Sequence, residues 1–163
     1  MSKGYSGLFS GTKGRPSPGS IDLMDKNDDF IKNIKRSSDI DTYGRLDIIA
    51  HGNPKSIQYQ INGKSVTLSH RELSKLLKSN KAYIGKSIRL LSCNTGENPN
   101  GFAQNLANKL NVIVEAPTKI VWAYPNGECL VASRDKSHPK YPNLNDRGKF
   151  VKFYPGGNKN GKH

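Results

Sequence analysis

The sequence predicts an α/β fold in which a mostly parallel central sheet carries added β-hairpins. Three short apolar runs, at residues 46–50, 88–91 and 112–114, have the length and composition of buried strands. Helical patterns separate these runs, and strands that alternate with helices favour right-handed crossovers and parallel pairing. The 163 residues are enough for one domain with a continuous core and too few to expect two.

The two ends of the chain differ in composition from its centre. Residues 1–20 are rich in Gly, Ser, Lys and Pro and predict a flexible junction or arm. Residues 21–154 are then the folded domain, and residues 155–163 form a disordered tail. No run approaches the roughly 20 apolar residues of a membrane span, and no apolar signal-peptide core follows the first lysine.

Three segments have the apolar spacing of amphipathic helices. The first covers residues 25–36, with acids in its first turn and lysines in its last, as the helix dipole prefers. The second begins at the capping-box pair Ser69 and Glu72. The third, over residues 102–110, follows the apolar run that ends at residue 91. The second and third helices therefore each lie between two expected strands.

Turn-forming dipeptides predict two hairpins. Segments IQYQ and SVTL alternate in polarity around Asn62-Gly63, the dipeptide that supplies positive φ at both central positions of a tight turn. Segments KIVWAY and ECLVA flank a second turn at residues 125–127. KFVKFY, close to the end of the chain, predicts one further edge strand.

The charge of the chain indicates an anionic partner. Lysine and arginine number 26 against 13 acids, which gives a formal net charge of +13. The lysines are scattered and no nucleic-acid-binding module is present, so nucleic acid is the less favoured partner. The chain has two cysteines, Cys93 and Cys129, and we expect both to be reduced because no dense cysteine framework surrounds them.

His51 and Cys93 are the candidate catalytic residues. Each directly follows or closes a buried strand and is followed by a loop of chain breakers, so both are expected at the rim where the carboxyl ends of the strands meet. A thiolate that attacks a carbonyl carbon, with imidazole to move the proton, performs acyl transfer. The N–H groups of Gly52 and Cys93 are candidates for holding the developing oxyanion, and the loop and helix after Cys93 favour thiolate.

The remaining reactive side chains have simpler interpretations. Either catalytic candidate alone is more often structural, and only their joint placement favours chemistry. Cys129 falls inside an expected strand and is interpreted as structural, while His70 and His138 are interpreted as solvated. No P-loop, dinucleotide glycine pattern, zinc knuckle or HExxH motif occurs, so neither a cofactor nor a metal is expected.

Blocks LDIIAHG and IRLLSCNTG resemble the paired blocks of the caspase-like (clan CD) cysteine peptidases, above all the self-cleaving domains of large bacterial toxins. The resemblance covers about residues 44–132. It implies a three-layer sandwich with helices on both faces of the sheet. Cys93 is then the nucleophile, His51 the proton donor to the leaving amine, and Gly52 with Cys93 the oxyanion donors.

The resemblance also suggests further site residues and a biological setting. Asp39 or Asp41 is the candidate acid that orients His51, and Trp122 is similar to a residue of the substrate cleft. The glycine- and lysine-rich start of the chain is similar to the junction before the C-terminal toxic domain of bacterial polymorphic toxins. That likeness implies delivery as part of a larger toxin, a protein substrate in the cytoplasm of the target cell and an acidic immunity protein.

Three functional hypotheses follow. The first is a toxin cysteine endopeptidase that uses Cys93 and His51. The second is a basic nuclease or other nucleic-acid-targeting toxin, for which the net charge of +13 is the motive. The third is a catalytically inactive caspase-like binding module that grips an acidic protein. Reactivity of Cys93 separates the first hypothesis from the third.

Overall fold

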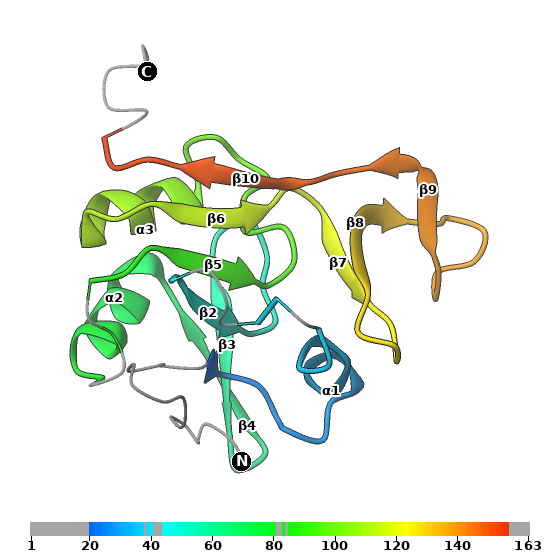
Figure 1. Ribbon diagram of the computed structural model, residues 1–163, viewed down its shortest axis with the longest axis horizontal. Coiled ribbons are helices and arrows are strands. Elements are labelled where there is room, and N and C mark those ends of the chain that lie inside the picture. Colours follow the sequence, from blue (N-terminus) through cyan, green and yellow to red (C-terminus); the bar gives the residue numbers. More distant parts are fainter. Residues whose placement is uncertain (1–19, 38, 41–43, 81–82, 84, 157–163) are drawn as a thin grey trace.

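A computed structural model describes residues 20–37, 39–40, 44–80, 83 and 85–156 (Figure 1). The predicted arm, apart from Ser20, and the tail from residue 157 onward lie outside the described residues. Ser20 itself opens the first strand of the central sheet, so regular structure begins inside the segment that was expected to be a junction.

The central sheet has five strands in the order β1-β2-β5-β6-β10. Its first four strands run parallel and the last runs antiparallel at the edge, so the prediction of a mostly parallel sheet in an α/β fold is confirmed. The predicted edge strand near the end of the chain is β10. The bounds are β1 Ser20–Asp22, β2 Leu46–Ile49, β5 Ile88–Leu91, β6 Val114–Pro117 and β10 Phe150–Phe153.

Different elements cover the two faces of this sheet (Figure 1). Helices α2 (His70–Lys78) and α3 (Phe102–Leu110) pack on one face, and their apolar side chains join those of β2, β5 and β6 in the larger core cluster. Helix α1 (Asp29–Ile34) packs with β7 (Ile120–Ala123) and β8 (Cys129–Arg134) against Ile49 and Leu91, which point to the opposite face.

The antiparallel additions follow the turn signals in the sequence. Strands β3 (Ile57–Ile61) and β4 (Lys64–Leu68) form a hairpin, and its turn residues Asn62 and Gly63 have φ of 50° and 80° as predicted. Strands β7 and β8 form the second predicted hairpin. A strand that was not predicted, β9 (Pro142–Arg147), pairs with β8 and extends this three-stranded sheet away from the centre (Figure 1).

A buried ion pair links the two middle strands of the central sheet. Asp47 on β2 and Arg89 on β5 are register partners, and Arg89 Nε donates to Asp47 Oδ1 at 2.8 Å. Arg89 Nη2 donates to Asp47 Oδ2 at 3.1 Å, and Arg89 Nη1 donates to Asp39 Oδ2 at 2.9 Å. Burial lowers the pKa of Arg89, but the two carboxylates more than offset this and leave it raised.

Candidate functional site

His51 and Cys93 follow neighbouring strands at the same rim of the central sheet. Strands β2 and β5 pair in parallel with Ile49 opposite Leu91, and Ala50 N–H donates to the Leu91 carbonyl at 3.3 Å just beyond the paired residues. His51 and Cys93 each lie two residues beyond this last paired position. The two residues expected to act together therefore follow the carboxyl ends of neighbouring parallel strands.

Gly52 packs its backbone directly against the residues around Cys93. A Cβ at Gly52 would lie 2.9 Å from Thr95 Cγ2, 3.0 Å from Ser92 Cβ and 3.1 Å from the Cys93 carbonyl oxygen. Side chains do not tolerate such distances without displacement of a neighbour. Glycine is thus required after His51 for the two strand ends to approach this closely.

An acidic residue that the sequence reasoning did not select bonds to His51. His51 Nε2 lies 2.8 Å from Asp28 Oδ2, and because a carboxylate accepts, Nε2 carries the proton of this bond. The other oxygen of Asp28 accepts from Phe30 N–H at 2.8 Å and caps α1. One carboxyl group thereby fixes both the start of the helix and the imidazole, and it leaves Nδ1 as the nitrogen able to take up a proton.

The sulfur of Cys93 lies beside the edge of β7. Val121 N–H donates to Cys93 Sγ at 3.4 Å. Burial raises the pKa of the Cys93 thiol, and the bond from Val121 together with the charge of Arg134 offsets only part of that effect. The expectation that the following loop and helix favour thiolate is therefore wrong, because α3 begins only at Phe102 and burial dominates.

The loop after Cys93 has a sharply turned backbone. Asn94 has φ of 62°, in the left-handed region that non-glycine residues seldom occupy. Its N–H donates to the Lys119 carbonyl at 3.0 Å, and Gly96 N–H donates to the Pro117 carbonyl at 2.8 Å. These bonds anchor the loop to the connection between β6 and β7 and so fix the position of the thiol.

Two backbone donors at this rim lack a backbone acceptor. Within the described residues, no carbonyl accepts from the N–H of Gly52 or from that of Cys93, although the neighbouring Ala50 and Asn53 N–H groups are both paired. Backbone N–H groups beside a thiol are the kind of donors that can hold an oxyanion, although the Cys93 N–H also contacts its own sulfur. These are the two groups that the sequence reasoning selected for this role.

The other predicted site residues lie elsewhere or have additional contacts. Asp39 bonds to Arg89 rather than to His51, and burial, which raises its pKa, is outweighed by the Arg89 and Ser37 bonds that lower it. Asp41 lies outside the described residues. Trp122 is part of β7, next to Val121; its Nε1–H donates to the Ala132 carbonyl and its ring lies 5.3 Å from the Arg134 guanidinium carbon.

Asp28 was missed because nothing local in the sequence links it to His51. In the sequence, Asp28 stands out only as one of the acids near the start of a helix, a pattern that the helix macrodipole alone explains. The link is tertiary and depends on the packing of α1 against the sheet, where the Phe30 and His51 rings lie 6.5 Å apart.

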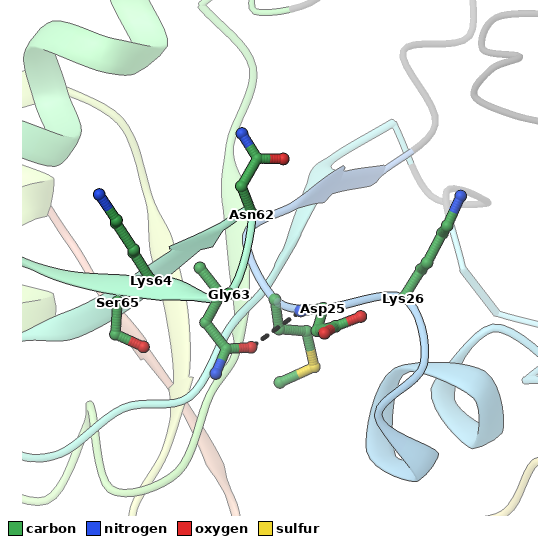
Figure 2. Close-up of a pocket in the computed structure, with 8 residues that line it drawn as sticks. Asp25, Lys26, Asn62, Gly63, Lys64 and Ser65 are labelled. Atoms are coloured by element: carbon green, nitrogen blue, oxygen red, sulfur yellow. Dashed lines mark hydrogen bonds between the residues drawn. The ribbon is translucent and has the colours of Figure 1, made fainter.

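A polar cavity of about 440 Å³ lies near the same rim, between the loop after β1 and the tip of the β3–β4 hairpin (Figure 2). Asp25 and Lys26 line it from the loop, and Gln60, Asn62, Lys64 and Ser65 are among the hairpin residues that line it. Gln60 Oε1 accepts from Asp25 N–H at 2.8 Å, which ties the two walls together (Figure 2).

Two further properties concern metals and membranes. Among the described residues, no three His, Cys, Asp or Glu side chains are grouped so that they could hold a metal ion. The described helices are all too short or too polar to span a membrane.

Comparisons with known proteins identify a family but no function. A family model described as "Domain of unknown function (DUF8616)" matches residues 19–131, which is more than half of the chain. No curated protein and no solved structure matches this sequence.

Proposed function

The chain belongs to the DUF8616 family, and we propose that it is a cysteine endopeptidase in which Cys93 and His51 hydrolyse a peptide bond of a protein substrate. The observation that carries this proposal is the placement of the two residues at adjacent strand ends, with the imidazole held by Asp28. If His51 were only solvated and Cys93 only structural, nothing would require them to follow neighbouring strands with the imidazole bonded to a carboxylate.

In the proposed reaction, Cys93 Sγ attacks the substrate carbonyl carbon while its proton passes to His51 Nδ1. The N–H groups of Gly52 and Cys93 hold the oxyanion, and the imidazolium then protonates the leaving amine as the C–N bond breaks. Water hydrolyses the remaining thioester and restores the thiol. Asp28 is a positioning residue that stabilises the imidazolium through Nε2. Because the pKa of Cys93 is raised, the resting protein holds a thiol, and proton transfer accompanies the attack.

The finer architecture and the biological role are parts of the same proposal. The caspase-like sandwich is supported by α2 and α3 on one face of the sheet and α1 on the other, although β7 and β8 share the second face. The role of a delivered bacterial toxin, neutralised by an acidic immunity protein, is supported by the net charge of +13 and the glycine- and lysine-rich start of the chain.

The decisive experiment compares new protein N-termini in cells that express the wild type, Cys93→Ala or His51→Ala. We expect cleavage products in the wild type and their loss in both variants, because removing the nucleophile or its proton carrier removes the acyl-transfer step. Cys129→Ser is the matched control and should retain the products, since Cys129 is an exposed residue of β8. Cleavage that persists in a folded Cys93→Ala protein would refute the proposal.

Asp28→Asn tests the positioning role separately. The amide keeps the shape of the side chain but cannot stabilise an imidazolium, so kcat should fall by about tenfold or more. Asp29→Asn is the control, because Asp29 is also an acid in the first turn of α1 but is not the residue bonded to His51. Equal effects of the two variants on kcat would show that Asp28 acts only through the helix. The pH dependence of kcat should move for Asp28→Asn alone.

A further inference from the structure

We propose that the polar cavity between the loop after β1 and the Asn62-Gly63 turn binds an acidic stretch of the substrate on the C-terminal side of the cleaved bond. This inference rests on the peptidase function proposed above and adds a substrate preference to it. Three observations support it: the place of the cavity along the rim, its closeness to His51 and the chemistry of its walls.

The order of elements along the rim decides which half of a substrate meets the cavity. Cys93 follows β5, His51 follows β2, and the loop with Asp25 and Lys26 follows β1, and these strands are consecutive neighbours in the sheet. In acyl transfer the acyl half stays on the sulfur, and the leaving amine takes its proton from the histidine. The leaving half therefore passes His51 on the side away from Cys93, toward β1 and the cavity.

Backbone contacts place the cavity close to His51. Gln58 N–H donates to the His51 carbonyl at 2.9 Å, and Gln60, two residues along β3, lines the cavity. Two residues of a strand span about 7 Å, which is also the length of two residues of an extended substrate. On the other wall, Asp28 N–H donates to the Asp25 carbonyl at 2.9 Å. The same short loop thus carries the partner of His51 and one wall of the cavity.

Hydrogen-bond donors and positive charge predominate in the walls. Lys26 and Lys64 stand on opposite sides of the view in Figure 2, and neither forms an ion pair within the described part of the chain. The Gln60 oxygen is occupied by Asp25 N–H, which leaves its amide donors for a ligand. Asn62 and Ser65 add an amide and a hydroxyl.

A single carboxylate opposes this set of donors. Asp25 lines the cavity, and its Oδ1 accepts from Asn27 N–H at 2.9 Å. Two lysines against one aspartate give the residues that line the cavity a net positive charge, and a cavity of about 440 Å³ is within the usual range for ligand sites. Its best match is a peptide segment with Asp or Glu side chains, whose oxygens accept from lysine, amide and hydroxyl groups.

The first test profiles cleavage sites in a peptide library derived from a whole proteome. We expect Asp and Glu to be enriched within about three residues after the cleaved bond for the wild type, and the Lys26→Gln/Lys64→Gln double variant to lose this enrichment. The acid preference should fall about threefold to 30-fold, as expected for two ion pairs made by exposed lysines. Lys136→Gln/Lys140→Gln, with the same change of charge in the β8–β9 loop, should keep it. Cleavage without acid enrichment in the wild type would overturn the inference.

A second measurement separates the cavity from the peptidase function. A capped peptide of alternating aspartate and glycine is titrated into the Cys93→Ala protein, with an asparagine–glycine peptide as the neutral control. Amide NMR shifts of Lys26, Gly63 and Ser65 should move with the acidic peptide only, and less at high salt. If the wild type cleaves nothing but these shifts move, the peptidase proposal fails and the acid-binding cavity stands. If the shifts do not move, the cavity proposal fails whatever the cleavage result.

Discussion

Strands β2 and β5 carry one polar pair, Asp47 and Arg89, and a second polar pair, His51 and Cys93, lies two residues beyond their carboxyl ends; the two pairs differ in burial and in bonding. Asp47 and Arg89, in the middle of the strands, are 0% and 7% exposed and joined by two hydrogen bonds. Four residues further on, the His51 side chain is 44% exposed and its ring nitrogen is shared with Asp28. Cys93, which follows β5 at the same rim, is partly buried and has a raised pKa.

The difference separates residues that hold the sheet from residues that are available to react. A buried charge is tolerated only with full pairing, so Asp47 and Arg89 have no capacity left for a ligand. At the rim, the Nδ1 of His51 and two backbone N–H groups remain without a backbone partner among the described residues. A reaction requires donors and acceptors that can contact a substrate. For this reason the proposed function is placed at the ends of the strands and not at their middle.

Arg89→Met should have the largest effect on stability. Removing the guanidinium leaves the Asp47 carboxylate at 0% exposure without its main partner, and breaking a buried pair in this way costs about 3–5 kcal/mol in the free energy of unfolding. Urea denaturation followed by circular dichroism measures the loss. The exposed Arg71→Met is the control and should change stability by less than about 0.5 kcal/mol. A double variant Asp47→Leu/Arg89→Met should recover much of the loss, since it leaves no buried charge unpaired.

Gly52→Ala should have a medium effect that combines stability with activity. The added Cβ meets Thr95 Cγ2 at 2.9 Å and the Cys93 carbonyl oxygen at 3.1 Å, so the strand ends must separate at a cost of about 1–3 kcal/mol. Peptidase activity should fall further than the lost stability explains, because the oxyanion donors move with the backbone. Adding Thr95→Ser removes the nearest atom and should restore part of the stability. Unchanged activity in Gly52→Ala would argue against Gly52 as an oxyanion donor.

Local signals in the sequence were enough for most elements of the fold and for two site residues. Turn chemistry at Asn62-Gly63 and the capping box at Ser69 and Glu72 were predicted because each depends on a few neighbouring residues. His51 and Cys93 were selected because apolar strands stop abruptly beside them. Parallel pairing of β2 with β5, which brings the two together, followed from the alternation of strands and helices.

Polar strands and tertiary contacts could not be predicted in the same way. Strands β1 and β9 have the sequences SID and PNLNDR, which lack the apolar alternation of a half-buried strand. Asp28 meets His51 only after α1 packs on the sheet. Asp39, one of the two acids proposed for this role, bonds to Arg89 in the fold. The pKa of Cys93 depends on burial, which the sequence does not reveal.

Ser92→Ala should have the smallest effect, although the residue lies between the two pairs and next to Cys93. Its hydroxyl is fully buried and has no hydrogen-bond partner among the described residues. Burying it therefore costs desolvation free energy that no hydrogen bond offsets, and removing the hydroxyl removes this cost. We expect the free energy of unfolding to stay equal or to rise by up to about 1 kcal/mol, with activity retained. Thr95→Val is the matched control: it deletes a hydroxyl that donates to the Ser92 carbonyl at 2.9 Å and should cost about 1 kcal/mol. If Ser92→Ala instead abolished cleavage at unchanged stability, the unpaired hydroxyl would belong with the reactive residues, and the reactive segment that follows β5 would begin at Ser92 instead of Cys93.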